Sequence, residues 1–334
     1  MRNSVSKAQQ EKKKHHYVWG HYLKNWSTDV KRKNVWRTTK TKKLEQHKVD
    51  EYSISGMLFE DYFYKTSNLD EYHLQIINNL FSKTDPSPKK IISNFMKVNF
   101  LRQKVEEYVD LGQTKYKEYL VYKSNFIEDM HSSIETTTIP ILDALANEDL
   151  SILDDEKNML NFMYYIANQN VRTKPFKENI IIYCGKKDPK FAEKLEECWW
   201  LVSYFLGITL GYSLYRSSKL DKHSLLINDT GESFLTSDNP VINVHPSISE
   251  DSVKLLEDHA LDLYYPISPT IAYTVYNSDV FPTGKVSVTL DQVVELNTKI
   301  AKRSNLSIVG NSKELVEKYK KYVGSSMKVI KGAK

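Results

Sequence analysis

Residues 12–26 read KKKHHYVWGHYLKNW and place a lysine run, three histidines, two tryptophans and two tyrosines in one short stretch. Imidazole rings exchange protons near neutral pH, and large aromatic rings contribute strongly to a protein core. The apolar or aromatic residues at 18, 19, 22, 23 and 26 have helical spacing, which predicts that residues 17–26 bury one face. We therefore expect this N-terminal segment to fold back onto the rest of the chain, which is organised around it.

Charge is distributed unevenly along the chain. Residues 1–48 contain fourteen Lys and Arg against Glu11, Asp29 and Glu45, a net charge of +11, so with a total of +5 the remaining 286 residues carry −6. A basic end attracts polyanions or anionic lipid through its local field, although a solvated lysine-rich arm has the same composition. Residues 1–14 lack apolar periodicity, and we expect them to form a flexible basic arm.

The composition is that of a soluble globular protein, with 27% charged and 40% hydrophobic residues. Two cysteines, Cys184 and Cys198, give no disulfide framework and no multi-cysteine metal site, which favours a reducing cytoplasm. The polar N-terminus has no apolar signal core. No charge occurs from Cys198 to Tyr215, and Gly207 and Gly211 lie four residues apart there. The run is at the short end for a bilayer, so we expect a central core helix and no membrane partner.

Periodicity and turn signals predict an α+β fold, a helical middle region packed on a mostly antiparallel C-terminal sheet. One domain is expected over 15–310, helical over about 70–220 and sheet-forming over about 223–310, followed by a C-terminal helix and tail over 311–334. Helices are predicted over 72–81, 88–109, 115–135, 140–147, 154–172, 191–215, 291–303, with Asp291 as N-cap, and 312–323. Strands are predicted over 34–39, 241–244, 261–265, 271–276, 286–290 and 306–309, with a hairpin over 224–228 and 232–236.

Several polar residues fall where an apolar residue is expected. Gln169 and Arg172 continue the apolar stripe of the 154–172 helix, and Asn297 lies among the apolar positions of the 291–303 helix. A buried polar group left unpaired costs about 1–3 kcal/mol, so such groups need partners. Asp238 and Asn239 directly follow a strand. They fit a structural turn, and they equally fit a carboxylate held rigidly enough to orient a histidine.

The histidines do not have a recognised metal-ligand spacing. His16 and His21 could meet on one helical face, but zinc takes three or four ligands, which would have to come from distant residues such as Asp238, His223 or His245. We therefore assign no metal ligand and expect no cofactor, with a divalent metal as the alternative. The chain contains no phosphate-binding glycine loop, nucleophile elbow or dinucleotide fingerprint.

A set of motifs spread along the chain occurs in one order: HHYV at 15–18, YL at 22–23, Trp26, VW at 35–36, ANQNVRT at 167–173, FLTSDNP at 234–240, YPISP at 265–269 and ELN at 295–297. Together, over roughly 15–310, they resemble the family named domain of unknown function 4238. The resemblance implies a soluble microbial protein of unassigned activity. It also marks polar residues already singled out here: His15, His16, Gln169, Arg172, Asp238, Asn239 and Asn297.

The chain departs from the family pattern at two places. Trp19 and Gly20 stand where the family has a proline-arginine pair, which removes a positive charge and weakens a phosphate-binding role for that loop. Lys174 is inserted between Thr173 and Pro175, where the family has Arg-Thr-Pro.

The marked residues come from separated regions, as residues of a shared site often do, and we expect them to converge. The leading hypothesis is a nuclease, metal-independent or weakly metal-assisted, that cleaves RNA or single-stranded nucleic acid, in the setting of a microbial defence or toxin effector. Its catalytic residues would be His16 as acid/base, His15, Asp238 as orienting group and Arg172 on the phosphate. Substrate would contact Gln169, Asn239, Asn297, Trp19, Tyr22 and Lys14.

Two other hypotheses fit the same residues. The protein could be a non-catalytic nucleic-acid-binding or regulatory protein, in which the polar cluster fastens the N-terminal segment to the sheet. It could also be a hydrolase of a small anionic metabolite, with the basic arm irrelevant. Nucleic-acid binding falls steeply with salt, which separates it from binding of a small ligand. The oligomeric state is left open.

Overall fold

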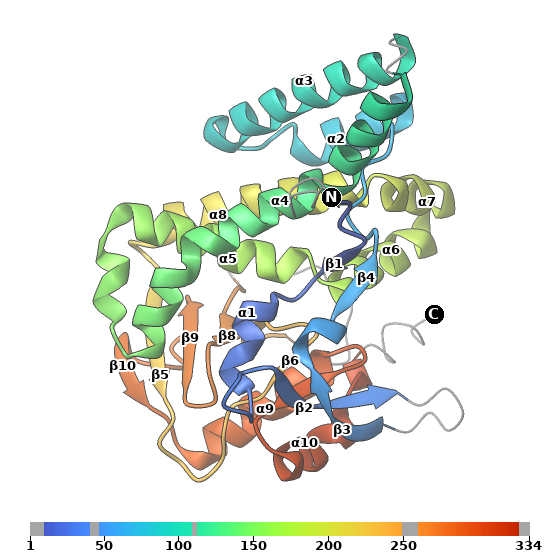
Figure 1. Ribbon diagram of the computed structural model, residues 1–334. Helices are drawn as coiled ribbons and strands as arrows, with labels where there is room; N and C mark the ends of the chain where they lie inside the picture. The colour runs from blue at the N-terminus through green and yellow to red at the C-terminus, as the bar shows by residue number, and fades with distance from the viewer. Residues whose placement is uncertain (1–9, 41–46, 109–111, 249–259, 327–334) are drawn as a thin grey trace.

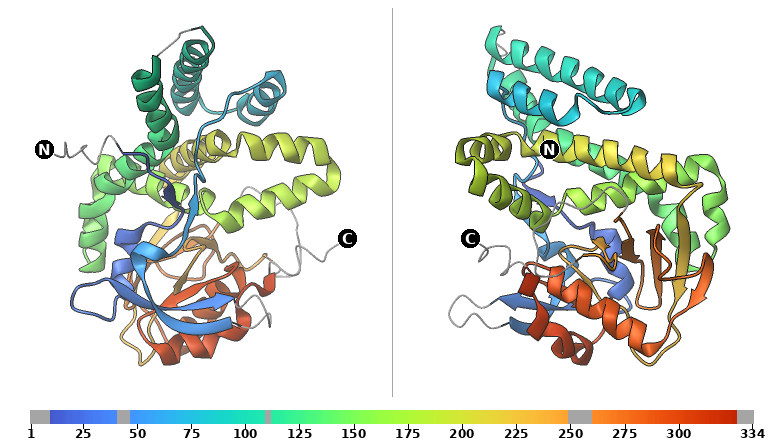
Figure 2. Two further views of the ribbon diagram at one scale, coloured as in Figure 1. Left: turned by 45° about the vertical axis from the view of Figure 1, so that its right-hand side comes forward. Right: turned by 180° about the vertical axis from the view of Figure 1, so that it is seen from behind.

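The computed structural model describes residues 10–40, 47–108, 112–248 and 260–326. As the sequence predicts, the fold is α+β, with a layer of helices lying over two mostly antiparallel sheets (Figure 1). Helices α2, α3 and the first part of α4 project from the far side of this layer (Figure 2). The N-terminal segment runs between the helical layer and the sheets, as expected, and lies close to both.

The helices of the middle region are long and largely where periodicity places them. Asp155 caps one of them by accepting a hydrogen bond from Asn158 N at 2.8 Å. Their bounds are α2 Glu71–Phe81, α3 Pro86–Tyr108, α4 Gly112–Ala146, the 3-10 turn η4 Leu150–Asp154, α5 Glu156–Val171, α6 Lys174–Lys187, α7 Pro189–Glu197 and α8 Trp199–Ser217.

The helix boundary predicted at Pro140 differs from the structure, whereas the one before Pro175 is confirmed. Pro140 lies inside α4, which joins the two helices predicted over 115–135 and 140–147. The helix continues because Ile141, Leu142 and Leu145 pack in the core, and tertiary packing outweighs local propensity. The helix predicted over 154–172 ends as expected, at Val171, and Pro175 lies in the first turn of the next helix, α6, a position where its missing N–H is not needed.

The main sheets have the orders β10-β5-β9-β8-β7 and β3-β2-β11-β6, and a third ribbon pairs β1 with β4. All pairs are antiparallel except β10 with β5. The strands are β1 Lys14–His16, β2 Asn34–Lys40, β3 His47–Ser53, β4 Phe59–Asp61, β5 Lys222–Ile227, β6 Thr236–Ser237, β7 Ile242–Asn243, β8 Leu263–Pro266, β9 Ile271–Tyr276, β10 Gly284–Ser287 and β11 Ile308–Gly310.

The predicted hairpin over 224–228 and 232–236 is wrong. β5 pairs with β9 and β10, whereas β6 joins the other sheet beside β11. Local hydrogen bonds prevent the hairpin, because Asn228 Nδ2 donates to Glu232 O and Phe234 N donates to Pro269 O, both at 2.8 Å. The turn residues are therefore used to carry the chain from one sheet to the other.

The N-terminal segment contains helix α1 Gly20–Leu23 and the 3-10 turn η2 Lys24–Trp26, a shorter helical stretch than predicted. Its apolar face is buried as expected, with Val18, Leu23 and Trp26 all at 0% exposure. Trp26 Nε1 donates to Phe234 O at 2.9 Å, and Tyr22 Oη donates to Pro266 O at 2.8 Å. The front of the chain is thus hydrogen-bonded to its rear half.

The basic arm expected over 1–14 is corrected for the residues that the structure describes. Lys12 N donates to Asn125 Oδ1 at 2.7 Å, and Asn125 Nδ2 donates to Gln10 O at 2.9 Å. The Lys12 ammonium pairs with Asp129 at 2.5 Å. Residues 10–12 are therefore docked on α4 by specific contacts, while residues 1–9 lie outside the described part of the chain.

Helix α8 is the uncharged helix considered above as a possible membrane span, and it packs against α5. A Cβ atom built on Gly207 would lie 2.6 Å from Asn168 Oδ1, and one built on Gly211 would lie 2.5 Å from Tyr164 Cδ1. The two glycines thus permit the close approach of α5 and α8, as predicted for a core helix. In the described ranges, no helix has the length and apolar character needed to cross a bilayer.

The two C-terminal helices pack in one hydrophobic cluster. Helix α9 Leu290–Arg303 is capped by Thr289, whose side chain accepts from Gln292 N, so the expected cap at Asp291 is wrong by two positions. The 312–323 prediction corresponds to α10 Lys313–Tyr319 and the 3-10 turn η5 Lys320–Tyr322. Leu315 and Val316 of α10 pack in the same hydrophobic cluster as α9, so this helix is part of the fold.

Candidate functional site

A polar stripe on α4 faces the interior of the helical layer. Ser124, Glu128, His131 and Glu135 are spaced by four, three and four residues, which places them on one face of the helix. Ser124, His131 and Glu135 are at most 8% exposed. Such a stripe must meet other polar groups, because burying a charge or hydrogen-bonding group alone is costly.

Arg172 meets this stripe from the end of α5. Its side chain, the C-cap of that helix, pairs with Glu135 through Nη2 and Oε1, and the residue is 1% exposed. Burial disfavours the charged guanidinium, but Glu135, Tyr64 and Glu128 outweigh this effect and raise the pKa of Arg172. Arg172 therefore stays positively charged inside the protein.

His15 is fixed in one neutral form by the backbone around it. Its Nδ1 accepts a hydrogen bond from Tyr64 N at 2.9 Å, so Nε2 carries the proton and donates to Lys12 O, also at 2.9 Å. Burial, chiefly, lowers the pKa of His15. Both nitrogens are occupied, which corrects the expectation that His15 is catalytic and gives it the task of holding β1 against Tyr64.

Tyr64 connects His15 to Arg172. Its ring stacks on the His15 ring at 5.8 Å, and its hydroxyl donates to Arg172 O at 2.9 Å. The same ring lies 4.8 Å from that of His131. We refer to His15, Tyr64, Glu128, His131, Glu135 and Arg172 as the interior polar cluster.

Several atoms of the interior polar cluster have no hydrogen-bond partner within the described ranges. They are both ring nitrogens of His131, Arg172 Nε and Glu128 Oε2. Both side-chain heteroatoms of Gln169, which precedes Arg172 by three residues on α5, are unpaired in the described structure as well. Unsatisfied buried groups are few in native proteins, and a concentration of them marks a place where water or a ligand is bound.

Glu128 is an acid of the cluster that titrates near neutrality. Burial is the main cause that raises its pKa to about 7, while Arg172 acts in the opposite direction and Glu135 raises it further. Near pH 7 the carboxyl group is therefore present in both protonation states. His131 behaves differently, because burial and the charge of Arg172 lower its pKa so far that it stays neutral.

His16 follows His15 on strand β1, so its side chain lies on the opposite face of the strand, and it is half-buried. Its ring packs on Phe59 with centroids 5.7 Å apart, and the Lys14 ammonium sits 4.4 Å from the centroid of the same Phe59 ring. Burial, then Arg172, then Lys14 lower the pKa of His16. We call Lys14, His16 and Phe59 the Phe59 surface.

The predicted site residues of the rear half do not join this cluster through a described contact. Both carboxylate oxygens of Asp238 accept backbone N–H groups, from Asn305 at 2.9 Å, Leu306 at 2.7 Å and Ser307 at 3.2 Å. Asp238 is 1% exposed, and burial raises its pKa to about 6 despite these hydrogen bonds. This corrects the expectation that Asp238 orients His16, since its oxygens hold the start of β11.

Two asparagines expected to bind substrate are held by backbone groups. Asn297 Oδ1 accepts from Leu235 N at 2.8 Å, and its Nδ2 donates to Ser233 O at 2.9 Å, which corrects its assignment to substrate binding. Asn239 is half-buried and donates to Arg303 O at 3.3 Å. Its Oδ1 lies 3.5 Å from the Thr173 hydroxyl. Asn239 therefore contacts the residue that directly follows Arg172 in the chain.

The two aromatic residues proposed as stacking surfaces also differ from expectation. Tyr22 is 1% exposed and bonded to Thr236 and Pro266, so it offers no face to a nucleic-acid base. Trp19 is half-buried and already stacked on the His21 ring at 4.8 Å. Phe59, which sequence reasoning missed, is the aromatic residue beside His16.

Comparison with known proteins places the chain in a family. A sequence model described as protein of unknown function, DUF4238, matches residues 14–198 and 218–314. The chain belongs to the DUF4238 family. No curated protein and no solved structure matches it.

Within this DUF4238 protein, all members of the interior polar cluster and of the Phe59 surface fall in the matched stretches. The interval between the two stretches, 199–217, coincides with α8. Sequence reasoning missed Tyr64, Glu128, His131 and Glu135, although the 128, 131, 135 spacing on a predicted helix was a signal for the last three.

One group of side chains in the DUF4238 protein has the composition of a metal site. Asp70, His73 and Glu197 place one potential ligand atom each within 4.8 Å of one another. The Lys194 ammonium already lies between the two carboxylates, 3.1 Å from Asp70 and 2.9 Å from Glu197, and His73 forms a capping box with Asp70. These contacts explain the group as an ion-pair network that joins α2 to α7.

Proposed function

We propose that this protein hydrolyses phosphodiester bonds in RNA or single-stranded nucleic acid, with His16 as the general base. The observation that carries the proposal is the Phe59 surface. There a half-buried imidazole, a lysine and an aromatic ring lie together on β1 and β4, next to the permanent charge of Arg172. This combination supplies the groups that a phosphodiester bond and an adjoining base require.

The protonation state of His16 suits a base. Since burial and two neighbouring cations lower its pKa, the ring is neutral at pH 7 and can accept a proton from an attacking hydroxyl or water. Glu128, with a pKa of about 7, is the carboxyl group that can exchange protons at the same pH. The charge of Arg172 favours a negatively charged transition state nearby.

Lys14 and Phe59 provide the contacts to the chain of the substrate. Lys12 and Lys13 form ion pairs with Asp129 and Asp61, so the lysine run is partly neutralised by the protein itself. Lys14 instead lies over the Phe59 ring, where its ammonium can meet a phosphate while the ring stacks on a base. This arrangement fits an unpaired strand, whose bases are open to stacking.

The decisive experiment compares His16→Ala with His21→Ala on labelled RNA and single-stranded DNA. His21 is the matched control, because it belongs to the same segment and burial lowers its pKa as well. We expect His16→Ala to reduce the cleavage rate by about 10²- to 10⁴-fold and His21→Ala to leave it nearly unchanged. Cleavage that is absent from the wild type, or equal in all three proteins, would contradict the proposal.

The proposed roles are filled by side chains, so EDTA is expected to leave the cleavage rate unchanged. Loss of activity with EDTA and its recovery with a divalent ion would replace the metal-independent form of the proposal by a metal-assisted one. A defence or toxin role would then be examined by expressing the wild type and His16→Ala in a bacterial host and comparing growth.

The second candidate is a non-catalytic nucleic-acid-binding protein. It is favoured by the contacts of His15, Lys12 and Asp238, which fasten chain segments and give each polar side-chain atom of these residues a partner in the described structure. This candidate predicts that Lys14→Gln weakens RNA binding and lowers its salt dependence, while no variant changes a cleavage rate. Binding of a small phosphate ester that varies little with salt would instead support a hydrolase of a small anion.

A further inference from the structure

Helix α3, in the group of helices that projects from the helical layer, carries a row of side chains that no described part of the chain covers (Figure 2). The buried face of α3 packs inward, where the Phe95 ring lies 5.3 Å from that of Phe126 and 5.5 Å from that of Phe205. Beside this face, exposed residues recur at alternating steps of three and four. They are Ile91, Asn94, Val98, Leu101 and Val105, which we call the α3 seam.

The spacing of the α3 seam is the one with which helices pack along one another. Steps of three and four residues place side chains in one narrow stripe along a helix, as in coiled coils. The apolar members are 40–65% exposed, and a contiguous exposed apolar stripe marks an interaction surface. Asn94 fits the same reading, because a single polar residue in such a stripe fixes the register of the paired helices. The seam therefore has the form of one half of a helix–helix interface.

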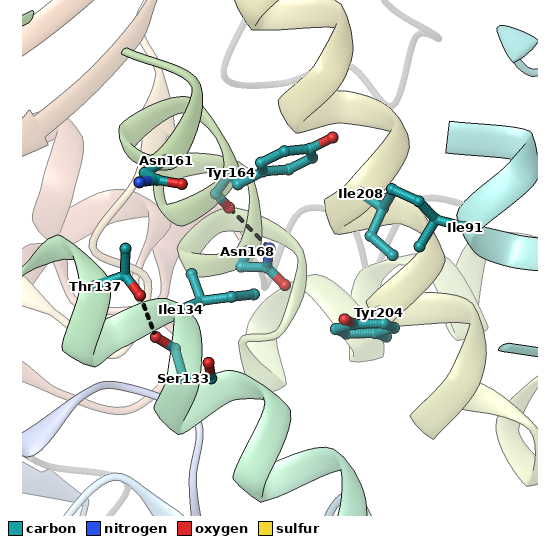
Figure 3. Close-up of a pocket in the computed structure, with 9 residues that line it drawn as sticks. All are labelled: Ile91, Ser133, Ile134, Thr137, Asn161, Tyr164, Asn168, Tyr204 and Ile208. Atoms are coloured by element: carbon teal, nitrogen blue, oxygen red, sulfur yellow. Dashed lines mark hydrogen bonds between the residues drawn. The ribbon is translucent and has the colours of Figure 1, made fainter. Parts of the chain in front are cut away.

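A pocket continues the α3 seam at its N-terminal end. Ile91, the first member of the seam, also lines a pocket of about 200 Å³ between α3, α4, α5 and α8. Figure 3 shows Ile91 reaching toward Ile208 of α8, with Ile134 and Tyr204 around the same space. None of the lining residues is charged, and a dry cavity of about 150 Å³ already accommodates a benzene ring. The pocket can therefore receive one large apolar side chain of a docked helix, the kind of anchor that dominates binding energy.

A row of lysines borders the seam on one side. Lys90, Lys97 and Lys104 recur every seven residues, each directly before an apolar member of the seam, and all three are exposed. In the described ranges none of them has an ion-pair partner, whereas Lys123 of α4 pairs with Glu106 of α3 at 2.8 Å. Charged residues that flank a helical seam select the partner by its charge. The lysine row therefore calls for a partner with acidic flanking residues.

A second copy of this chain does not meet that requirement. In an antiparallel pair the two lysine rows would face each other and repel. In a parallel pair each row would face Phe95 and Arg102 of the other copy, which are buried in its own fold. The two ends of the chain beyond the described ranges, 1–9 and 327–334, contain basic residues and no acidic one. An acidic segment of another protein is the occupant that complements the charge.

We propose that the α3 seam binds an amphipathic helix of a protein partner, whose flank carries glutamate or aspartate opposite Lys90, Lys97 and Lys104. The apolar residues of that helix pack on the seam, and one of them occupies the pocket beside Ile91. Nucleic acid fits less well, because its phosphates would pair with the lysines and leave the apolar side chains exposed. The proposal does not rest on cleavage at the Phe59 surface, so His16→Ala should bind the partner helix like the wild type.

Two synthetic helical peptides of about three heptads are the probes. Both have leucine along their seam, and their flanking positions are glutamate in one peptide and lysine in the other. Fluorescence anisotropy with the full chain should show saturable binding of the glutamate peptide, at least about tenfold tighter than that of the lysine peptide. No saturable binding of the glutamate peptide, or equal binding of both, would overturn the proposal.

A leucine variant tests the apolar part of the interface. Leu101 is 65% exposed, so Leu101→Ser removes a member of the seam without opening the core. Leu220→Ser is the matched control, since Leu220 is an 88% exposed leucine that follows α8. We expect Leu101→Ser to weaken binding of the glutamate peptide by at least about tenfold and Leu220→Ser to leave it unchanged. Undiminished binding by Leu101→Ser would show that the peptide binds elsewhere.

A lysine variant tests the charge. Lys97→Glu should reduce the preference for the glutamate peptide by at least about fivefold. Lys313→Glu should retain the preference, because Lys313 is an exposed residue at the start of α10. Binding that is lost in Lys97→Glu but kept in Leu101→Ser would overturn the proposal in favour of a polyanion site. A wild type that dimerises in sedimentation experiments while Leu101→Ser stays monomeric would instead assign the seam to a second copy.

Discussion

The guanidinium of Arg172 and the carboxylate of Glu135 form an ion pair inside the helical layer, with only 2% and 11% of the two side chains exposed. The pair joins the end of α5 to the middle of α4. Both residues also belong to the interior polar cluster, whose remaining atoms are incompletely hydrogen-bonded. The stability of the helical layer therefore depends on keeping each buried charge opposite its partner.

Replacing Glu135 by glutamine should destabilise the protein strongly, because the buried charge of Arg172 would lose its ion-pair partner. We expect a loss of about 3–5 kcal/mol in the free energy of unfolding, measured by urea denaturation. Glu295→Gln is the control, since Glu295 pairs with Lys299 on the surface of α9. That change should cost less than about 1 kcal/mol. Similar losses in both variants would mean that water reaches the Arg172 pair.

Glu128 should make stability depend on pH in the acidic to neutral range. Its pKa in the folded protein, about 7, is above the ordinary value of 4.5, so the folded state binds more protons between these values. The contribution to stability is present below pH 4.5 and is lost as the pH rises through 7. At about 1.4 kcal/mol per unit, Glu128→Gln should stabilise the protein by up to about 3 kcal/mol more at pH 8 than at pH 4.5.

The measurement for Glu128 is a series of urea denaturation curves over this pH range. Glu118→Gln is the control, as Glu118 is an exposed residue of the same helix. We expect its curves to follow those of the wild type at every pH. A Glu128→Gln protein whose stability varies with pH as the wild type does would show that another group carries the dependence.

Gln169 and Asn297 are buried amides that differ in their hydrogen bonding. Replacing each by leucine should therefore change the free energy of unfolding by different amounts. Gln169 has no partner for either side-chain heteroatom within the described ranges, so Gln169→Leu is expected to change the free energy of unfolding by less than about 1 kcal/mol or to stabilise. Asn297→Leu should cost at least about 2 kcal/mol, since it leaves Leu235 N and Ser233 O unpaired. A large loss for Gln169→Leu would reveal bound water or ligand on that amide.

The glycines of α8 should differ in their tolerance of alanine. At Gly211 the added methyl would lie 2.8 Å from Tyr164 Cα, which is backbone, whereas at Gly207 its close neighbours are atoms of the Asn168 side chain. We expect Gly211→Ala to cost about 1–3 kcal/mol and to be the more harmful of the two. Gly231→Ala, where nothing lies within 4 Å, should be neutral. Thermal denaturation of the three variants measures these differences.

Helical periodicity alone locates much of the framework of the site. The apolar spacing of Phe162 and Ile166 and the acidic residues at 154–156 predict α5 closely, and the spacing also predicts that Gln169 and Arg172 point inward, as both do at 1% exposure. This succeeds because the direction of a helical side chain depends only on its position along the helix.

The partner of Arg172 could not be predicted in the same way. Glu135 lies 37 residues earlier, on a helix whose polar spacing fits a solvated face as well as a buried one. Asp238 illustrates the converse problem. Its rigid position after a strand was predicted, but its oxygens accept backbone N–H groups from 67 to 69 residues later. A carboxylate accepts from an imidazole or an amide equally well, and only tertiary contacts decide between them.

The hydrogen bonds of Trp26 and Tyr22 also constrain the order in which the protein can assemble. Their acceptors, Phe234 and Pro266, are separated from them by 208 and 244 residues. During synthesis the N-terminal segment therefore emerges from the ribosome long before the residues that cover it. The hydrogen bond of Tyr22 to Pro266 cannot form until nearly four fifths of the chain has been made. Long-range closure of this kind slows folding and makes chaperone assistance valuable at the ribosome exit.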